Sequence, residues 1–167
     1  MEKHRYIIGI DPDVEKSGMA CLDMETRQVE VCAIVFPELL QSLLRYVDED
    51  VAIVIEDSDM SVNWHYGSAD KPGIIAAKGR SVGMCHATTR HIREICDYLG
   101  FDVYMQRPLR KMWKGPDGKI TQEEIMQFIP GLPKKMNQEC RDAALLAWNE
   151  AGLPIRIPAS FYAKKDD

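Results

Sequence analysis

The sequence lacks a long hydrophobic run, closely spaced cysteines and any internal repeat. No stretch approaches the roughly 20 consecutive apolar residues that a helix needs to cross a bilayer, so we expect no membrane association. Residues 1–5 lack the apolar region of a signal peptide, which predicts a cytoplasmic protein. The five cysteines are scattered, odd in number and without a Cys-x-x-Cys pair. This favours reduced, buried thiols over disulfides or a structural zinc site.

The 167 residues fit a single domain that can bury a substantial core. We expect residues 1–157 to form this domain. Residues 158–167 are polar toward their end and predict a mobile tail.

Charge is distributed unevenly along the chain, although the net charge is only -5. Residues 1–60 carry 14 acidic and 5 basic side chains, whereas residues 71–119 carry ten basic and four acidic ones. Two interpretations stay open: a solvated helix and loop, or a basic face beside an acidic pocket.

Hydrophobic patterns predict an α/β fold with one mixed, five-stranded sheet. The strand-like segments are residues 5–11, 18–22, 28–36, 51–56 and 101–106, and the helical ones are residues 38–47, 73–99, 121–129 and 137–151. The first three strands predict an antiparallel meander, and the helical crossovers allow the first, fourth and fifth strands to run parallel. The expected strand order is therefore 3-2-1-4-5, with helices on both faces.

The long predicted helix over residues 73–99 has an apolar stripe at steps of three and four from Val82 to Leu99, so one face of it should be packed. Gly79 and Gly83 also lie on this helix, where each costs about 1 kcal/mol relative to alanine. Because such a cost is usually tolerated where another backbone must come close to the helix, we expect a close backbone contact at these glycines.

Two carboxylates end neighbouring apolar strands: Asp11 closes the first strand and Glu56 closes the fourth. Glu139 and Asp142 lie three apart on one face of the last helix, beside alanines that let this helix approach the sheet closely. Clustered carboxylates repel unless a cation lies between them. Together they predict a pocket of hard oxygen ligands for Mg²⁺ or Mn²⁺, with two ions about 3.5–4 Å apart acting on a phosphodiester.

Taken singly, three of these carboxylates have a simpler explanation. Asp11 could cap a turn, and Glu139 and Asp142 could be solvated helix charges. Arg141 could contact phosphate or form an ordinary ion pair.

Five short motifs, in order over residues 5–150, resemble RuvC-type Holliday junction resolvases of the ribonuclease H-like superfamily. Gly9-Ile-Asp-Pro with Gly18 is similar to their first-strand motif, and Ile55-Glu56 to their second carboxylate. Residues 78–83 resemble the start of their long helix, residues 107–119 their basic segment, and residues 139–144 their closing helix.

The resemblance implies a ribonuclease H-like fold and a homodimeric, Mg²⁺-dependent endonuclease that nicks branched DNA symmetrically, with Mn²⁺ able to substitute. It implies Asp11, Glu56, Glu139 and Asp142 as catalytic metal ligands, and helicase or recombination proteins as partners. The DNA contacts that we expect are Lys78, Arg80, Arg107, Arg110, Lys111, Lys114, Lys119, Trp64 and Tyr66.

The sequence departs from the family pattern at several positions. Asp13 stands where a glycine is usual, and Glu139 replaces a shorter ligand. Asp57 and Asp59 follow Glu56, where the family usually has a base-stacking aromatic three residues after the carboxylate. Trp64, with its neighbours His65 and Tyr66, could supply the stacking or could pack on the core. Three alternatives to a junction resolvase therefore remain. Two are a ribonuclease H-like nuclease acting on flaps or RNA, and a non-catalytic branched-DNA-binding module. The third is a nucleotide-hydrolysing relative of the actin and sugar-kinase type, against which the short chain and the lack of a repeated phosphate-binding turn argue.

Overall fold

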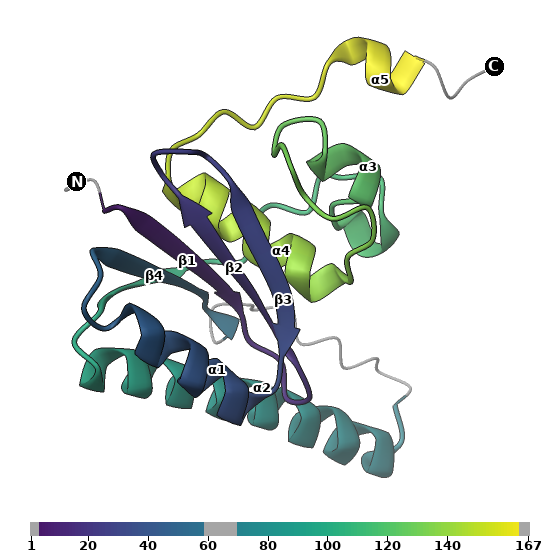
Figure 1. Cartoon of the computed structure of the whole chain (residues 1–167). Helices are drawn as coiled ribbons and strands as arrows, with labels where there is room; N and C mark the ends of the chain where they lie inside the picture. Colours follow the sequence, from purple (N-terminus) through teal and green to yellow (C-terminus); the bar gives the residue numbers. More distant parts are fainter. Residues whose placement is uncertain (1–3, 59–69, 164–167) are drawn as a thin grey trace.

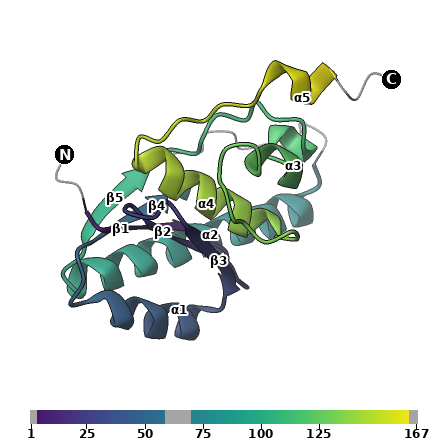
Figure 2. The same ribbon diagram turned by 45° about the horizontal axis from the view of Figure 1, so that its top comes forward.

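The computed structural model describes residues 4–58 and 70–163. Its sheet has the order β3-β2-β1-β4-β5, as predicted. The strands are β1 (Tyr6–Asp11), β2 (Ser17–Asp23), β3 (Val29–Ile34), β4 (Val51–Glu56) and β5 (Asp102–Gln106). Strands β1, β2 and β3 form the antiparallel meander, and β1, β4 and β5 run parallel (Figure 2).

Helices cover both faces of the sheet (Figure 1). The helices are α1 (Phe36–Leu43), η1 (Leu44–Tyr46), α2 (Pro72–Tyr98), η3 (Pro116–Gly118), α3 (Gln122–Ile125), α4 (Gln138–Glu150) and α5 (Ala159–Ala163). Helices α1 and α2 pack on one face, where their apolar side chains meet Ile8, Ile10, Ile53 and Ile55. Helix α4 packs on the other face.

The alternation of side chains along β1 decides which residues α4 meets. Ile8 and Ile10 point toward α1 and α2, so Ile7, Gly9 and Asp11 lie on the α4 face. The same alternation in β4 places Glu56 on the α4 face, two residues after Val54.

Several helix boundaries differ from the sequence prediction. The predicted helix over residues 38–47 ends at Leu43 and continues as the 3₁₀ turn η1. Thr121 forms a capping box with Glu124 at the start of α3, which ends at Ile125 instead of residue 129. The amides of Gln127 and Phe128 then bond three residues back, as in a 3₁₀ turn.

Helix α2 is packed over only part of its length. Its buried residues are Thr89, Ile92 and Cys96, and its N-terminal part extends past the sheet (Figure 1). The close backbone approach predicted at Gly83 is wrong, because a Cβ there would meet open space. Among the described residues, no helix is long and apolar enough to span a bilayer.

The C-terminal segment differs in part from a simple tail. Ala159–Ala163 form the short helix α5, and Tyr162 is hydrogen bonded to Glu124. Residues 164–167 lie outside the described part of the chain.

Candidate acidic site and its basic surroundings

Asp11 and Glu56 lie side by side at the carboxyl ends of two paired strands. The parallel register pairs Gly9 with Val54 and Ile10 with Ile55, so the next residues along the two strands are Asp11 and Glu56. Both side chains are on the α4 face. The sheet therefore brings together two carboxylates that are 45 residues apart in the sequence.

Two glycines let α4 lie directly on the sheet above these carboxylates. A Cβ at Gly18 would overlap the backbone carbonyl of Glu139, and one at Gly9 would overlap that of Ala143. Asn137 caps the helix by accepting a hydrogen bond from the Cys140 amide at 3.0 Å. The first turns of α4 are thus fixed above the ends of β1 and β2.

The carboxylates on the sheet and on α4 influence one another electrostatically. Burial, followed by the charges of Glu56 and Asp142, raises the pKa of Asp11 to about 8, while Lys119 opposes the rise. Burial and Asp142 raise the pKa of Glu56, and Lys119 and Lys111 oppose it. Glu139 contributes least of these charges to the pKa of Asp11. A site that penalises ionised carboxylates in this way favours a bound cation.

Both oxygens of Asp142 accept hydrogen bonds. Lys119 Nζ donates to Oδ2 over 3.2 Å, and Gln138 Nε2 donates to Oδ1 over 2.7 Å. The charges of Asp142, Asp11 and Glu56 raise the pKa of Lys119 despite the opposing effect of its burial. Lys119, expected only as a phosphate contact, thus carries positive charge into the acidic site.

The donor set fits hard divalent cations in its chemistry. It consists of carboxylate oxygens, and each oxygen of Asp142 keeps a second lone pair for another partner. Within residues 4–58 and 70–163, no three His, Cys, Asp or Glu side chains already form a complete metal-binding group. The fit therefore rests on the oxygen donors and on the penalty that burial places on the charge of Asp11.

The basic segment after β5 begins beside the acidic site. The last pair between β4 and β5 joins Glu56 to Gln106, so Arg107 follows directly at this edge. Arg107, Arg110 and Lys111 are exposed. Lys114 lies over the ring of Tyr162, with Nζ 4.4 Å from the ring centroid.

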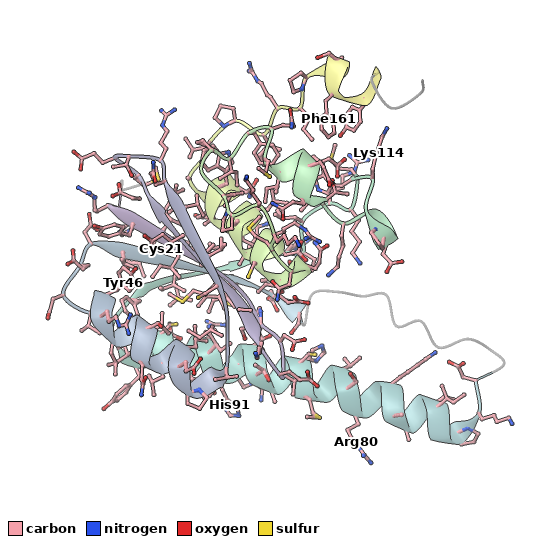
Figure 3. All side chains as sticks on the ribbon, turned by 45° about the vertical axis from the view of Figure 1, so that its right-hand side comes forward. Cys21, Tyr46, Arg80, His91, Lys114 and Phe161 are labelled. Carbon is pink, nitrogen blue, oxygen red and sulfur yellow. The ribbon has the colours of Figure 1, made fainter. Side chains whose placement is uncertain are left out.

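The other expected DNA contacts come from the part of the chain between β4 and the middle of α2. On α2, Lys78 forms an ion pair with Asp70 at 2.6 Å, and Arg80 points away from the sheet (Figure 3). Trp64 and Tyr66, with His65 and Asp59, lie outside the described residues.

Asp13 and Arg141 have structural partners. Asp13 Oδ1 accepts hydrogen bonds from the amides of Glu15 and Lys16, which stabilises the turn between β1 and β2. Arg141 donates to the carbonyls of Ile120 and Met136 and to the Gln138 side chain. Its guanidinium therefore joins α4 to the segment that follows Lys119, a third role beside the two that the sequence left open.

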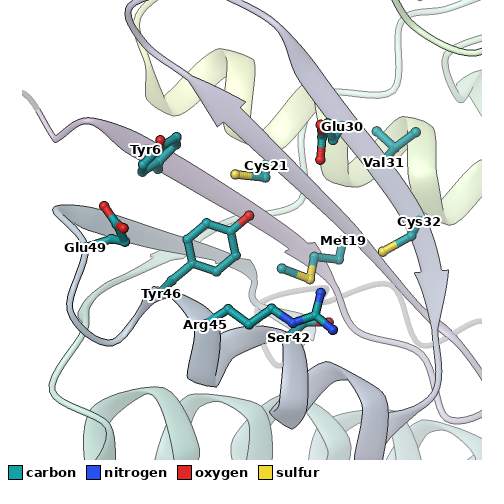
Figure 4. A pocket seen from close by; sticks show the side chains of 10 residues that line it. All are labelled: Tyr6, Met19, Cys21, Glu30, Val31, Cys32, Ser42, Arg45, Tyr46 and Glu49. Atoms are coloured by element: carbon teal, nitrogen blue, oxygen red, sulfur yellow. The ribbon is translucent and has the colours of Figure 1, made fainter.

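A separate pocket of about 300 Å³ lies on the opposite face of the sheet, against α1 and η1 (Figure 4). Met19, Cys21 and Tyr46 line it together with charged side chains such as Arg45 and Glu49. Burial raises the pKa of the Cys21 thiol, and a hydrogen bond with Tyr46 opposes this rise. None of the four carboxylates of the acidic site lines this pocket.

Comparison with known proteins identifies the fold. The structure of Thermus thermophilus RuvC matches 88% of this chain and 96% of its own, at a TM-score of 0.50 and 17% identity. T. thermophilus RuvC in complex with a Holliday junction substrate matches 96% of each chain, at a TM-score of 0.51 and 17% identity. The chain has a RuvC-like fold. No protein-family model and no curated protein sequence matches it.

The RuvC-like fold confirms the predicted sheet and its order. Sequence reasoning did not anticipate Gln138 as a partner of Asp142, nor Glu124 and Tyr162 as partners of the basic segment. A signal for Gln138 was present, since residues four apart face one another on a helix. The contact of Tyr162 spans 38 residues and left no local signal.

Proposed function

We propose that this protein is a metal-dependent endonuclease that hydrolyses phosphodiester bonds in branched DNA. The observation that carries the proposal is the position of Asp11 and Glu56 at adjacent strand ends, with Asp142 above them on α4. The RuvC-like fold supports the choice of substrate, because one matching structure holds RuvC with a Holliday junction substrate.

Two Mg²⁺ ions would be held by these carboxylates, and Mn²⁺ would substitute. Asp11, Glu56 and Asp142 would hold these ions, and Glu139 would assist. When bound, the ions lower the pKa of a water molecule and stabilise the leaving oxygen of the phosphodiester.

The remaining residues make the approach of DNA possible. Four carboxylates repel a phosphate, and Lys119 and Lys111 offset part of that charge at the site itself. Lys78, Arg80, Arg107, Arg110 and Lys114 would bind phosphates farther out, which fixes the position of the DNA without reading its sequence.

A homodimer would supply the two active centres that symmetric nicking requires. Helix α2 leaves the large apolar side chains of Ile74, Ile75 and Met84 exposed in the single chain. Sedimentation equilibrium should therefore give about twice the 19.0 kDa mass of one chain.

The decisive test is cleavage of a labelled synthetic four-way junction in Mg²⁺, Mn²⁺ and EDTA, with duplex, flap and RNA–DNA hybrid substrates alongside. Asp142→Asn should abolish cleavage. Glu150→Gln, at the far end of the same helix, should leave it unchanged. Paired nicks in the junction alone, lost in EDTA, would support the proposal.

Other outcomes distinguish the alternatives. Preferential cutting of flaps or hybrids would support the metal site but show that the substrate is not a four-way junction. Junction binding without cleavage in any metal would leave a non-catalytic binding module.

A further inference from the structure

Glu124 is the one charged side chain among the described residues that is almost completely buried, with 1% of its surface exposed. Its carboxylate accepts hydrogen bonds from the Thr121 amide at 3.0 Å, the Lys114 amide at 3.1 Å and the Tyr162 hydroxyl at 3.0 Å. Burial alone would raise its pKa, but these donors together lower it. A capping box accounts for the Thr121 contact and leaves the other two to be explained.

The Lys114 and Thr121 amides belong to the two sides of one hairpin. Within it, the Trp113 amide donates to the Gly118 carbonyl and the Gly115 amide to the Lys119 carbonyl, both at 3.0 Å. One carboxylate therefore clamps both sides of the hairpin.

Lys119 projects from this hairpin toward Asp142. It lies two residues before Thr121. Its carbonyl accepts a hydrogen bond from the amide of Gly115, the residue after Lys114. The position of its ammonium in the acidic site thus depends on the backbone that Glu124 holds.

Tyr162 completes the arrangement from the other end of the chain. Its hydroxyl donates a hydrogen bond to the Glu124 carboxylate, and its ring lies under the Lys114 ammonium. Tyr162 therefore contacts both Glu124 and the hairpin. Figure 3 shows α5, marked by Phe161, near Lys114. The C-terminal helix is therefore joined to the same hairpin that carries Lys119.

We propose that Glu124 and Tyr162 are positioning residues, which hold the hairpin over residues 111–121 so that Lys119 reaches the acidic site. The part that concerns cleavage rests on the proposed function. The part that concerns the hairpin stands independently of it.

Hydrogen exchange on the full-length, DNA-free protein tests the positioning directly. Glu124→Gln replaces one acceptor oxygen by a donor, so the Lys114 and Thr121 amides should exchange at least about tenfold faster. Tyr162→Leu should accelerate them several-fold and Tyr162→Phe less, because phenylalanine keeps the ring. The α4 amides should be unchanged in all three variants. Tyr98→Leu, at a tyrosine that is 90% exposed, is the matched control and should have no effect on the hairpin.

Junction cleavage by the same variants separates positioning from general stability. We expect kcat to fall about tenfold in Tyr162→Leu with little change in KM, and Tyr162→Phe to recover most of it. Unchanged hairpin exchange in Glu124→Gln and Tyr162→Leu would overturn the proposal, as would faster exchange with an unchanged kcat. If the wild type cleaves no substrate, the proposed function fails, and the exchange data alone decide whether the two residues hold the hairpin.

Discussion

The ammonium of Lys119 donates a hydrogen bond to Oδ2 of Asp142 over 3.2 Å, and so links the basic segment to the last helix. The charge of the same lysine opposes the rise in the pKa of both Asp11 and Glu56. One positive charge therefore partly compensates the negative charges of three carboxylates, which come from β1, β4 and α4.

Replacement of Lys119 should change the affinity of the site for metal. In Lys119→Gln the carboxylates lose a compensating charge, so Mn²⁺ should bind several-fold more tightly, as measured by electron paramagnetic resonance titration. Junction cleavage should nevertheless fall, because no ammonium remains to meet the phosphate. Lys135→Gln, at an exposed lysine, serves as the control; weaker Mn²⁺ binding by Lys119→Gln would contradict this account.

Asp11 should make the metal-free protein less stable as pH rises. The folded chain keeps the Asp11 proton until pH about 8, whereas the ordinary pKa is 3.8, so the unfolded chain releases its proton first. Stability is then lost between about pH 4 and pH 8 and stays level above that range. Asp11→Asn should gain on the order of 5 kcal/mol relative to wild type at pH 8 and little at pH 4.

Urea unfolding in EDTA at a series of pH values measures this gain. Glu150→Gln should follow the wild-type curve. An Asp11→Asn variant that is less stable than wild type at pH 8 would show that the carboxylate is not penalised in the folded state.

The glycines under α4 should tolerate no side chain. In Gly18→Ala the new Cβ would overlap the Glu139 carbonyl, so α4 must shift, at a cost of about 1–3 kcal/mol. The shift also moves Asp142, and junction cleavage should drop more than tenfold. Gly83→Ala is the matched comparison, because it adds the same methyl in open space within a helix and should stabilise by up to about 1 kcal/mol. Equal thermal unfolding midpoints for the two variants would refute this explanation of Gly18.

Arg141 should act on stability and Arg110 on DNA binding. Arg141→Lys cannot satisfy the Ile120 and Met136 carbonyls and Gln138 together, so it should lose about 1–2 kcal/mol in urea unfolding. Its DNA affinity should keep the wild-type dependence on salt. Arg110→Gln should fold normally and reduce the slope of log affinity against log salt by about 1. A reduced slope in Arg141→Lys would instead make that residue a phosphate contact.

The sequence by itself determined the strands, their order and the carboxylates that end them. Runs such as Val51–Ile55 are apolar and β-branched throughout, and such local patterns predict a buried strand without any long-range information. Asn137 and Thr121 likewise marked the starts of two helices, because a cap depends on residues only three positions away.

Only the tertiary structure decided how these pieces meet. Gly9 and Gly18 admit the α4 backbone, whereas Gly83, on a helix where the sequence predicted such an approach, faces open space. Lys119 reaches Asp142 across 23 residues, and Tyr162 reaches Glu124 across 38. Contacts at such separations depend on how the helices and the hairpin pack against the sheet, and no local pattern of residues encodes that packing.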